Sequence, residues 1–219
     1  MKKRDVYTFV KKAWYFIWHD DSVLSWIVNV ILAFILIKYV VYPLLGLILG
    51  TSFPIVAVVS ESMEHNVPFD SWWEKNSKWY ADNGIAREQF ASFSFRNGFN
   101  KGDIIFLIYK EPKKIERGDV IVFISHRLDP RPDPIIHRVV NVQNDNGIHF
   151  QTKGDNNGRA LDDCDNTGCI DETDIVEKQV LGRALFRIPL LGWVKIIFVD
   201  IIAEPYCTLT NNLFPCRGV

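Results

Sequence analysis

The sequence lacks an excess of either charge. Its 25 lysine and arginine residues are balanced by 26 aspartate and glutamate residues, which gives no overall attraction to nucleic acid, and we expect no nucleic-acid partner. It also lacks a phosphate-binding P-loop, a dinucleotide-binding glycine motif and repeats at solenoid or propeller periods. With 219 residues, 48% of them hydrophobic, the chain has room for one globular domain and a membrane anchor.

Cysteine is scarce as well, and the four residues are Cys164, Cys169, Cys207 and Cys216. Their intervals of 5, 38 and 9 positions match no common zinc site, and we expect neither a metal nor another cofactor. Two local disulfides are allowed if this part of the chain lies in an oxidising compartment.

Only one apolar run is long enough to cross a membrane, and it covers residues 23–50. As a helix with a rise of about 1.5 Å per residue it extends about 42 Å, more than a hydrocarbon core of about 30 Å. The run is too long for a cleaved signal peptide, so we expect a single anchor over residues 22–50. Lys38 lies within it and is expected to face another subunit or to reach an interface.

Residues 1–21 combine basic and aromatic side chains, which predicts an amphipathic helix resting on the lipid bilayer. Basic residues before an anchor favour a cytosolic N-terminus. The domain that follows is then expected outside the cell membrane, or in the lumen of the endoplasmic reticulum in a eukaryote.

Residues 51–185 are expected to form a mostly β domain, with two strands that each begin after a Gly-Asp turn. The apolar runs that predict strands are residues 54–63, 104–108, 120–124, 135–142 and 148–152. Within this domain, residues 64–100 form an aromatic insertion for which we expect one or two short helices. The insertion predicts either an interfacial belt that dips into lipid headgroups or a small satellite core.

Residues 186–219 form an apolar segment and tail. Charged residues interrupt the apolar segment before it reaches about 18 positions, so we do not expect a second membrane-spanning helix. A strand followed by a short helix is expected there. The helix would pack on the domain, dip into the bilayer or dock on partner subunits.

Two serines follow the anchor closely, in Ser60-Glu61-Ser62-Met63. In an extended chain Ser60 and Ser62 share a face, so one hydroxyl can attack while the other donates a hydrogen bond. Two serines at the end of a strand are also common without any catalytic role.

A base for such a serine is available in His137, which shares a strand face with Ile135 and Val139. Histidine titrates near neutral pH, as a general base for serine requires, although a lone histidine on an apolar face is more often a core residue. His65 and His126 are rival bases, whereas His19 is expected on the opposite side of the membrane.

Carboxylates that can orient an imidazole follow in Gly154-Asp155-Asn156-Asn157 and Leu161-Asp162-Asp163. These residues are also ordinary turn formers. Calcium binding by the acidic stretch 155–174 is an alternative, but its ligand spacing is irregular.

Taken in order behind one anchor, these segments resemble type I signal peptidases of the archaeal and endoplasmic-reticulum kind. The resemblance covers roughly residues 50–200 and includes Ser60 to Met63, both Gly-Asp strands, Ile136 to Val139, Lys153 to Asn157 and Gly182 to Ala184. The bacterial branch uses a lysine base, whereas His137 stands at the matching position here. The resemblance therefore implies a signal-peptidase-like β domain and a Ser-His serine endopeptidase.

The roles that the resemblance implies are specific. Ser62 would be the nucleophile and His137 the general base, with the oxyanion bound by the Ser62 N–H and the Ser60 hydroxyl. The family's acidic residues fall on Asp155 and on Asp163 or Asp162, with Asp163 favoured. The insertion is absent from the endoplasmic-reticulum enzymes, which leaves the route of the substrate open.

Signal-peptide-bearing preproteins are the substrates that the resemblance implies, and removal of their signal peptides is the implied reaction. Partners in a secretion translocon or accessory subunits are further expectations. The alternative is a catalytically silent, single-pass accessory or receptor subunit whose β domain only binds extended peptides. A self-cleaving regulatory protein is disfavoured because the chain has an anchor and no DNA-binding module.

Overall fold

The computed structural model describes residues 3–125, 133–144, 147–165 and 168–193. The chain divides into two compact units, Met1–Ile48 and Leu49–Val219. His126 and most of the proline-rich loop lie outside the described residues, as do Cys207, Cys216 and the expected C-terminal helix.

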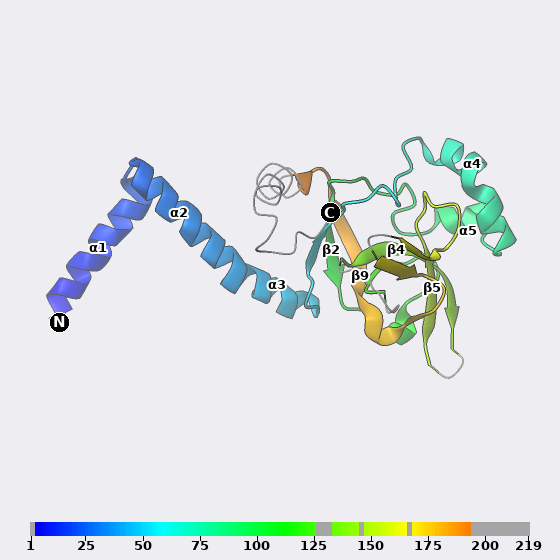
Figure 1. Cartoon of the computed structure of the whole chain (residues 1–219). Coiled ribbons are helices and arrows are strands. Elements are labelled where there is room, and N and C mark those ends of the chain that lie inside the picture. The colour runs from blue at the N-terminus through cyan, green and yellow to red at the C-terminus, as the bar shows by residue number, and fades with distance from the viewer. Residues whose placement is uncertain (1–2, 126–132, 145–146, 166–167, 194–219) are drawn as a thin grey trace. The chain divides into compact units, whose positions relative to one another are not determined.

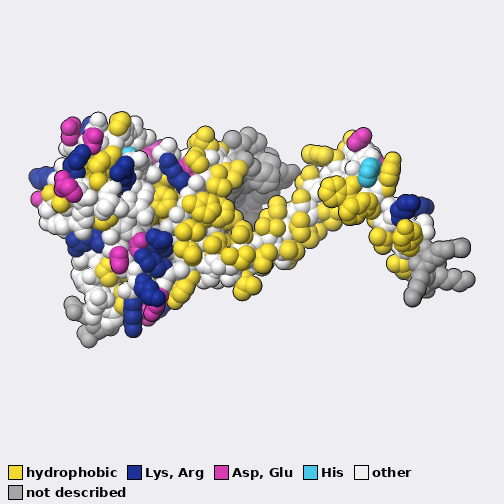
Figure 2. All heavy atoms as spheres, turned by 180° about the vertical axis from the view of Figure 1, so that it is seen from behind, with side chains coloured by type: hydrophobic (Ala, Val, Ile, Leu, Met, Phe, Trp, Pro, Cys, Tyr) yellow, Lys and Arg dark blue, Asp and Glu magenta, His cyan; other side chains and the backbone are white. Residues whose placement is uncertain are grey.

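The first unit is helical, and apolar side chains cover much of its surface (Figure 2). Its elements are α1 (Lys3–His19), α2 (Val23–Leu36), the π-helical turn η1 (Ile37–Val41) and α3 (Tyr42–Leu49). Together α2, η1 and α3 make one continuous helix, Val23–Leu49, that is long and apolar enough to cross a membrane. The single long apolar run that the sequence predicts to be an anchor is thus a helix.

The π-helical turn in this helix contains Lys38 and precedes Pro43. Proline has no N–H to donate to the carbonyl four residues earlier, that of Tyr39, and its ring crowds that carbonyl. The helix widens there, and the Tyr42 N–H donates to the Ile37 carbonyl five residues back.

The second unit is mostly β, which confirms the expected fold class. Its strands are β1 (Ile55–Ala57), β2 (Ile104–Ile108), β3 (Val120–Phe123), β4 (Ile135–Gln143), β5 (His149–Lys153), β6 (Asp162–Asp165), β7 (Gly168–Asp171), β8 (Ile175–Val176) and β9 (Val180–Ile188). Seven of them form an antiparallel sheet in the order β1-β2-β9-β3-β4-β5-β8, and β6 pairs with β7 (Figure 1). Its helices are α4 (Phe69–Asp82), α5 (Arg87–Ala91) and the 3₁₀ turns η2 (Pro112–Lys114) and η3 (Glu177–Gln179).

Both Gly-Asp turns have the same construction. Gly102 and Gly118 adopt positive φ angles of 89° and 99°, a region that L side chains rarely enter. The carboxylates of Asp103 and Asp119 each accept the backbone N–H three residues earlier, and each pairs with an arginine of β9. The turns therefore fix the starts of β2 and β3 and connect both to β9, the strand that lies between them.

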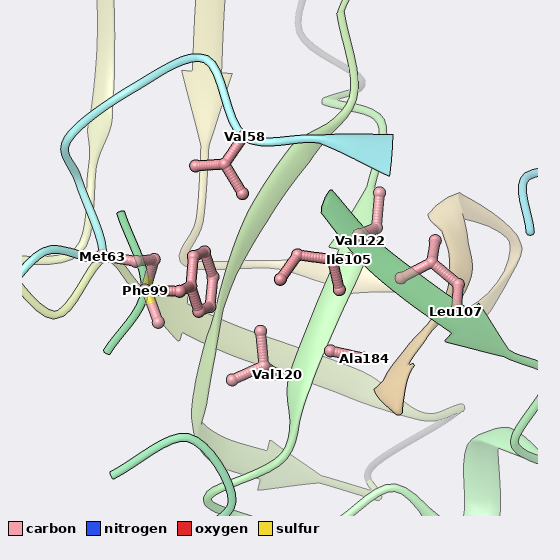
Figure 3. Close-up of a cluster of buried hydrophobic side chains, with 8 residues drawn as sticks. All are labelled: Val58, Met63, Phe99, Ile105, Leu107, Val120, Val122 and Ala184. Atoms are coloured by element: carbon pink, nitrogen blue, oxygen red, sulfur yellow. The ribbon is translucent and has the colours of Figure 1, made fainter. Parts of the chain in front are cut away.

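The main core lies against β2, β3 and β9. It consists of Val58, Met63, Phe99, Ile105, Leu107, Val120, Val122 and Ala184, all almost completely buried (Figure 3). Val58 and Met63 both enter this core, although they are five positions apart. In a strand, residues an odd number of positions apart face opposite sides, so the chain between these two has to leave the strand conformation.

The strand expected over residues 54–63 is accordingly too long. β1 ends at Ala57, and Ser60 to Met63 form a turn in which the Glu64 N–H donates to the Glu61 carbonyl at 3.0 Å. Burial of Met63 outweighs the β propensity of the Val-rich stretch before it. Ser60 and Ser62 thus lie on a turn rather than on one face of an extended strand.

The aromatic insertion forms its own buried cluster. Its buried members are Trp72, Trp73, Tyr80, Ile85 and Phe90, which pack with Val140 of β4. Of the two expectations for this segment, these residues fit the satellite core, because their side chains are buried within the protein instead of facing outwards. Through Val140, the cluster attaches α4 and α5 to β4.

We expect Phe90→Ala to lower the free energy of unfolding by about 3–5 kcal/mol. Phe90 has no exposed surface, so the substitution leaves a cavity among the surrounding side chains. Urea unfolding followed by tryptophan fluorescence measures this, since Trp72 and Trp73 lie beside Phe90. Phe186→Ala is the matched control, because Phe186 is 45% exposed and should contribute only about 1 kcal/mol. Equal losses in both variants would contradict a satellite core.

Candidate active site

The turn that carries Ser62 faces His137 on β4. The Ser62 Oγ lies 2.8 Å from His137 Nε2, although the two residues are 75 positions apart. The Ser60 Oγ lies 3.1 Å from the Ser62 Oγ. The structure thus brings together the three residues expected to form the nucleophile, the base and one oxyanion donor.

Behind the imidazole lies Glu172, which the sequence analysis did not single out. The His137 Nδ1 is hydrogen-bonded to a Glu172 carboxylate oxygen, and both side chains are buried. A carboxylate can only accept, so Nδ1 carries the proton and the Nε2 lone pair faces the Ser62 hydroxyl. This is the tautomer that a general base for serine needs.

Glu172 is held in position from both sides. Its carboxylate also accepts the Thr152 hydroxyl at 3.0 Å and the Leu161 N–H at 2.8 Å, and its backbone pairs with the same two residues. A weak sequence signal for it exists, because Glu172 follows Ile170 by two positions, the spacing at which side chains of an extended chain share a face.

The other expected acidic residues belong to different segments of the chain. Asp162 and Asp163 lie in β6, where their backbones pair with Asp171 and Ile170. In the same hairpin Cys164 and Cys169 stand opposite one another, and a disulfide between them stays a prediction.

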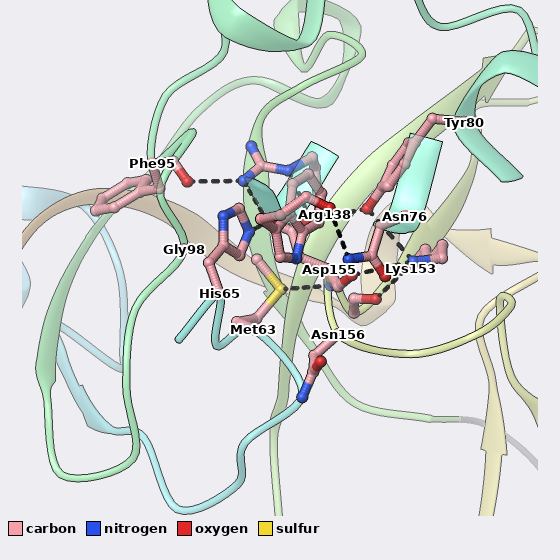
Figure 4. Close-up of polar contacts among 12 residues, drawn as sticks. Met63, His65, Asn76, Tyr80, Phe95, Gly98, Arg138, Lys153, Asp155 and Asn156 are labelled. Carbon is pink, nitrogen blue, oxygen red and sulfur yellow. Dashed lines mark hydrogen bonds and ion pairs between the residues drawn. The ribbon is translucent and has the colours of Figure 1, made fainter. Parts of the chain in front are cut away.

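Asp155 accepts hydrogen bonds from Arg138, His65 and Tyr80 at the base of the satellite core, not from His137 (Figure 4). The pair with Arg138 is bidentate, at 2.9 Å and 2.7 Å, and neither side chain is exposed. Burial alone would raise the pKa of Asp155, but the Arg138 charge and the hydrogen bonds from His65 and Arg138 outweigh it and hold this pKa well below its usual range. Burial and the neighbouring Asp155 raise the pKa of Tyr80, so its hydroxyl stays protonated and donates.

Arg138 connects the site to the insertion. Besides Asp155, its guanidinium donates to the carbonyls of Ser94, Phe95 and Gly118 at 2.7–3.0 Å, so all of its five N–H groups are used. The guanidinium also lies over the Phe90 ring, 4.8 Å from its centre.

His65, a rival base, is likewise committed to the insertion. Its Nε2 contacts the Asp155 carboxylate at 3.0 Å, and its ring stacks on Trp72 with 3.8 Å between centres. It therefore supports the segment after Ser62 and does not face the Ser62 hydroxyl.

The residues after β5 hold the serine turn directly. The Asn156 N–H donates to the Ser62 carbonyl at 2.7 Å, and its side-chain amide donates to the Glu61 carbonyl at 3.1 Å. Gly154 allows this approach, since a Cβ there would lie 2.8 Å from His137 Nε2 and 2.9 Å from the Ser62 carbonyl oxygen. The Gly-Asp-Asn segment thus positions the serine, while its aspartate anchors it to Arg138.

Comparison with known proteins identifies the family, although no protein-family model matches the chain. The signal peptidase complex catalytic subunit SEC11C of Homo sapiens is 37% identical over 122 residues, which are 54% of this chain and 59% of that protein. The corresponding subunit of Schizosaccharomyces pombe is 30% identical over 167 residues, 74% of this chain and 76% of that protein. This chain belongs to the family of signal peptidase catalytic subunits.

The resemblance seen in the sequence is thereby confirmed at the level of the signal peptidase family. A third signal peptidase subunit, SEC11 of Yarrowia lipolytica, is 33% identical over 110 residues. The chain spans about three fifths of the length of the first of these signal peptidase relatives.

We expect Asp155→Asn to lower the free energy of unfolding by about 3–5 kcal/mol, because it leaves the Arg138 charge buried without its partner. Chemical denaturation measures this loss. Asp70→Asn is the control, since Asp70 pairs with Arg87 at an exposed site and should change stability by less than about 1 kcal/mol. Because the pKa of Asp155 is lowered on folding, the difference between wild type and Asp155→Asn should hold above about pH 4 and shrink at lower pH. A difference that grows on acidification would contradict the ionised pair.

Proposed function

We propose that this chain is a membrane-anchored serine endopeptidase that removes signal peptides from secreted and membrane preproteins. The observation that carries the proposal is the 2.8 Å contact between the Ser62 Oγ and His137 Nε2, with a buried carboxylate behind the imidazole. Membership of the signal peptidase family supports the choice of substrate.

The chemistry follows from this geometry. His137 takes the Ser62 hydroxyl proton as the oxygen attacks the scissile carbonyl carbon, and the carbonyl oxygen becomes an oxyanion. The Ser62 N–H and the Ser60 hydroxyl donate hydrogen bonds to it. When the carbon–nitrogen bond breaks, His137 returns the proton to the leaving amine, and water then hydrolyses the acyl-serine by the same steps in reverse.

Among the carboxylates, we propose Glu172 as the residue that orients His137, because its oxygen contacts Nδ1. Asp155 would act indirectly, through the segment that holds Ser62. A direct role for Asp162 or Asp163 stays a prediction from the family resemblance.

The anchor and the membrane topology belong to the same proposal. The helix Val23–Leu49 would hold the chain in a cell or endoplasmic-reticulum membrane, with a cytosolic N-terminus and an external β domain. Because the relatives are named as catalytic subunits of a complex, we infer that accessory subunits or a secretion translocon are partners. Extended peptide substrates would pair with strand edges near Ser62.

Ser62→Ala and His137→Ala are each expected to reduce cleavage of a signal-bearing preprotein by about 10⁶-fold. Ser60→Ala should reduce it by about 10²–10³-fold, the usual loss for one oxyanion donor. The measurement uses the detergent-solubilised full chain. Ser92→Ala and His149→Ala are matched controls, because Ser92 is exposed and His149 forms a partly exposed pair with Asp174. Normal cleavage by a folded Ser62→Ala protein would instead favour a silent binding subunit.

Glu172→Gln is expected to lower turnover by about 10²–10⁴-fold, because an amide no longer fixes the Nδ1–H tautomer of His137. The comparison is with Asp163→Asn and Asp174→Asn in the same assay, with circular dichroism to confirm folding. A large loss in Asp163→Asn together with normal turnover in Glu172→Gln would transfer the orienting role to Asp163. Asp174→Asn should cleave like wild type.

A further inference from the structure

A hollow of about 320 Å³ lies between α4 and the segment that follows β5. Lys75, Lys78, Trp79 and Asp82 line it from α4, and Lys153 and Asn157 line it from the opposite side. The hollow therefore exists only because the insertion stands next to the segment that positions Ser62.

The lining carries more positive than negative charge, with three lysines and one aspartate. Lys75 and Lys78 are exposed, so their ammonium groups are free to turn towards a ligand. Lys153 is 1% exposed and fixed, since its Nζ donates to the carbonyls of Gly154 and Asp155 at 3.0 Å and 3.3 Å and to the Tyr80 hydroxyl at 3.4 Å. It therefore contributes charge to the hollow but no free N–H. Burial lowers the pKa of Lys153 to about 8, which still leaves it mostly charged at neutral pH. A fixed charge backed by two mobile ones attracts anions.

Asn157 adds a donor to this lining. Its Nδ2 is buried and has no hydrogen-bond partner among the residues that the structure describes. A buried amide without a partner is unfavourable, so a turn of this side chain towards a carboxylate oxygen in the hollow would satisfy it. The hollow thus combines positive charge with an unused N–H.

Asn157, one of the residues that line the hollow, also connects it to His137. A Cβ on Gly154 would lie 2.7 Å from Asn157 Nδ2 and 2.8 Å from His137 Nε2, so both nitrogens border the same glycine. Nε2 is the atom that gives its proton to the leaving amine in the proposed reaction. The part of the substrate that follows the scissile bond therefore departs past this edge.

We propose that the hollow binds an acidic side chain of the substrate within the first few residues after the scissile bond. This inference rests on the proposed peptidase function and adds a preference on the leaving side of the cut. The ligand is a carboxylate, and the lysines of α4 with the Asn157 amide are the specificity-determining groups. The insertion would accordingly select substrates by charge, separately from the groups that perform the chemistry.

The test uses preproteins that differ only in having Glu or Gln at one of the first four positions after the scissile bond. In uncharged detergent, wild type should cleave the best Glu substrate with a kcat/KM about fivefold above its Gln counterpart, as expected for one partly exposed ion pair. In Lys75→Glu/Lys78→Glu this ratio should fall to one or below. The exposed lysines of η2 supply the matched control, Lys113→Glu/Lys114→Glu, in which the ratio should stay at the wild-type value.

The outcomes separate this inference from the proposed function. Failure of wild type to cleave any substrate would remove both. Equal cleavage of Glu and Gln substrates at every position would overturn the carboxylate site alone. If the ratio is one and only vesicles containing phosphatidylglycerol stimulate wild type above Lys75→Glu/Lys78→Glu, the hollow binds lipid phosphate and the inference is wrong.

Discussion

The buried ion pair between Arg138 and Asp155 is the interaction on which the rest of the site depends. Two charges without solvent are stable only when every donor and acceptor is used, and here the guanidinium N–H groups are all used. Arg138 directly follows His137, and Asp155 directly precedes Asn156, which holds the Ser62 carbonyl. One pair therefore aligns the strand that bears His137, the proposed base, with the segment that supports Ser62, the proposed nucleophile, and it attaches both to the satellite core.

Neighbouring residues of β4 point to opposite faces of the sheet. His137 points to the serine turn and Glu172, whereas Arg138 points to the insertion and reaches Asp155. The alternation of side chains along a strand is enough to separate them. The proposed chemistry and the support of the insertion consequently come from adjacent positions without competing for space.

The long apolar helix, the main strands and the meeting of Ser62 with His137 could be predicted from the sequence, because they follow from long apolar runs and from an ordered set of motifs. Glu172 could not be selected the same way, since it is one of several acids in a stretch whose spacing carries no regular pattern. What identifies it is burial beside Thr152 and Leu161, a tertiary property. Local propensity predicts a strand over the serine turn, because it does not include the burial of Met63 in the core.

Only a short stretch of chain separates the end of the long apolar helix from Ser62. Ser62 follows Leu49, the last residue of α3, by about 13 positions, which even a fully stretched chain would span in about 45 Å. Hydrogen bonds from Tyr109 to Leu49 and from Thr51 to Leu181 fasten the beginning of this tether to the sheet. In the proposed membrane-bound peptidase, the length of this tether sets an upper limit on how far from the membrane surface a polypeptide can be cut.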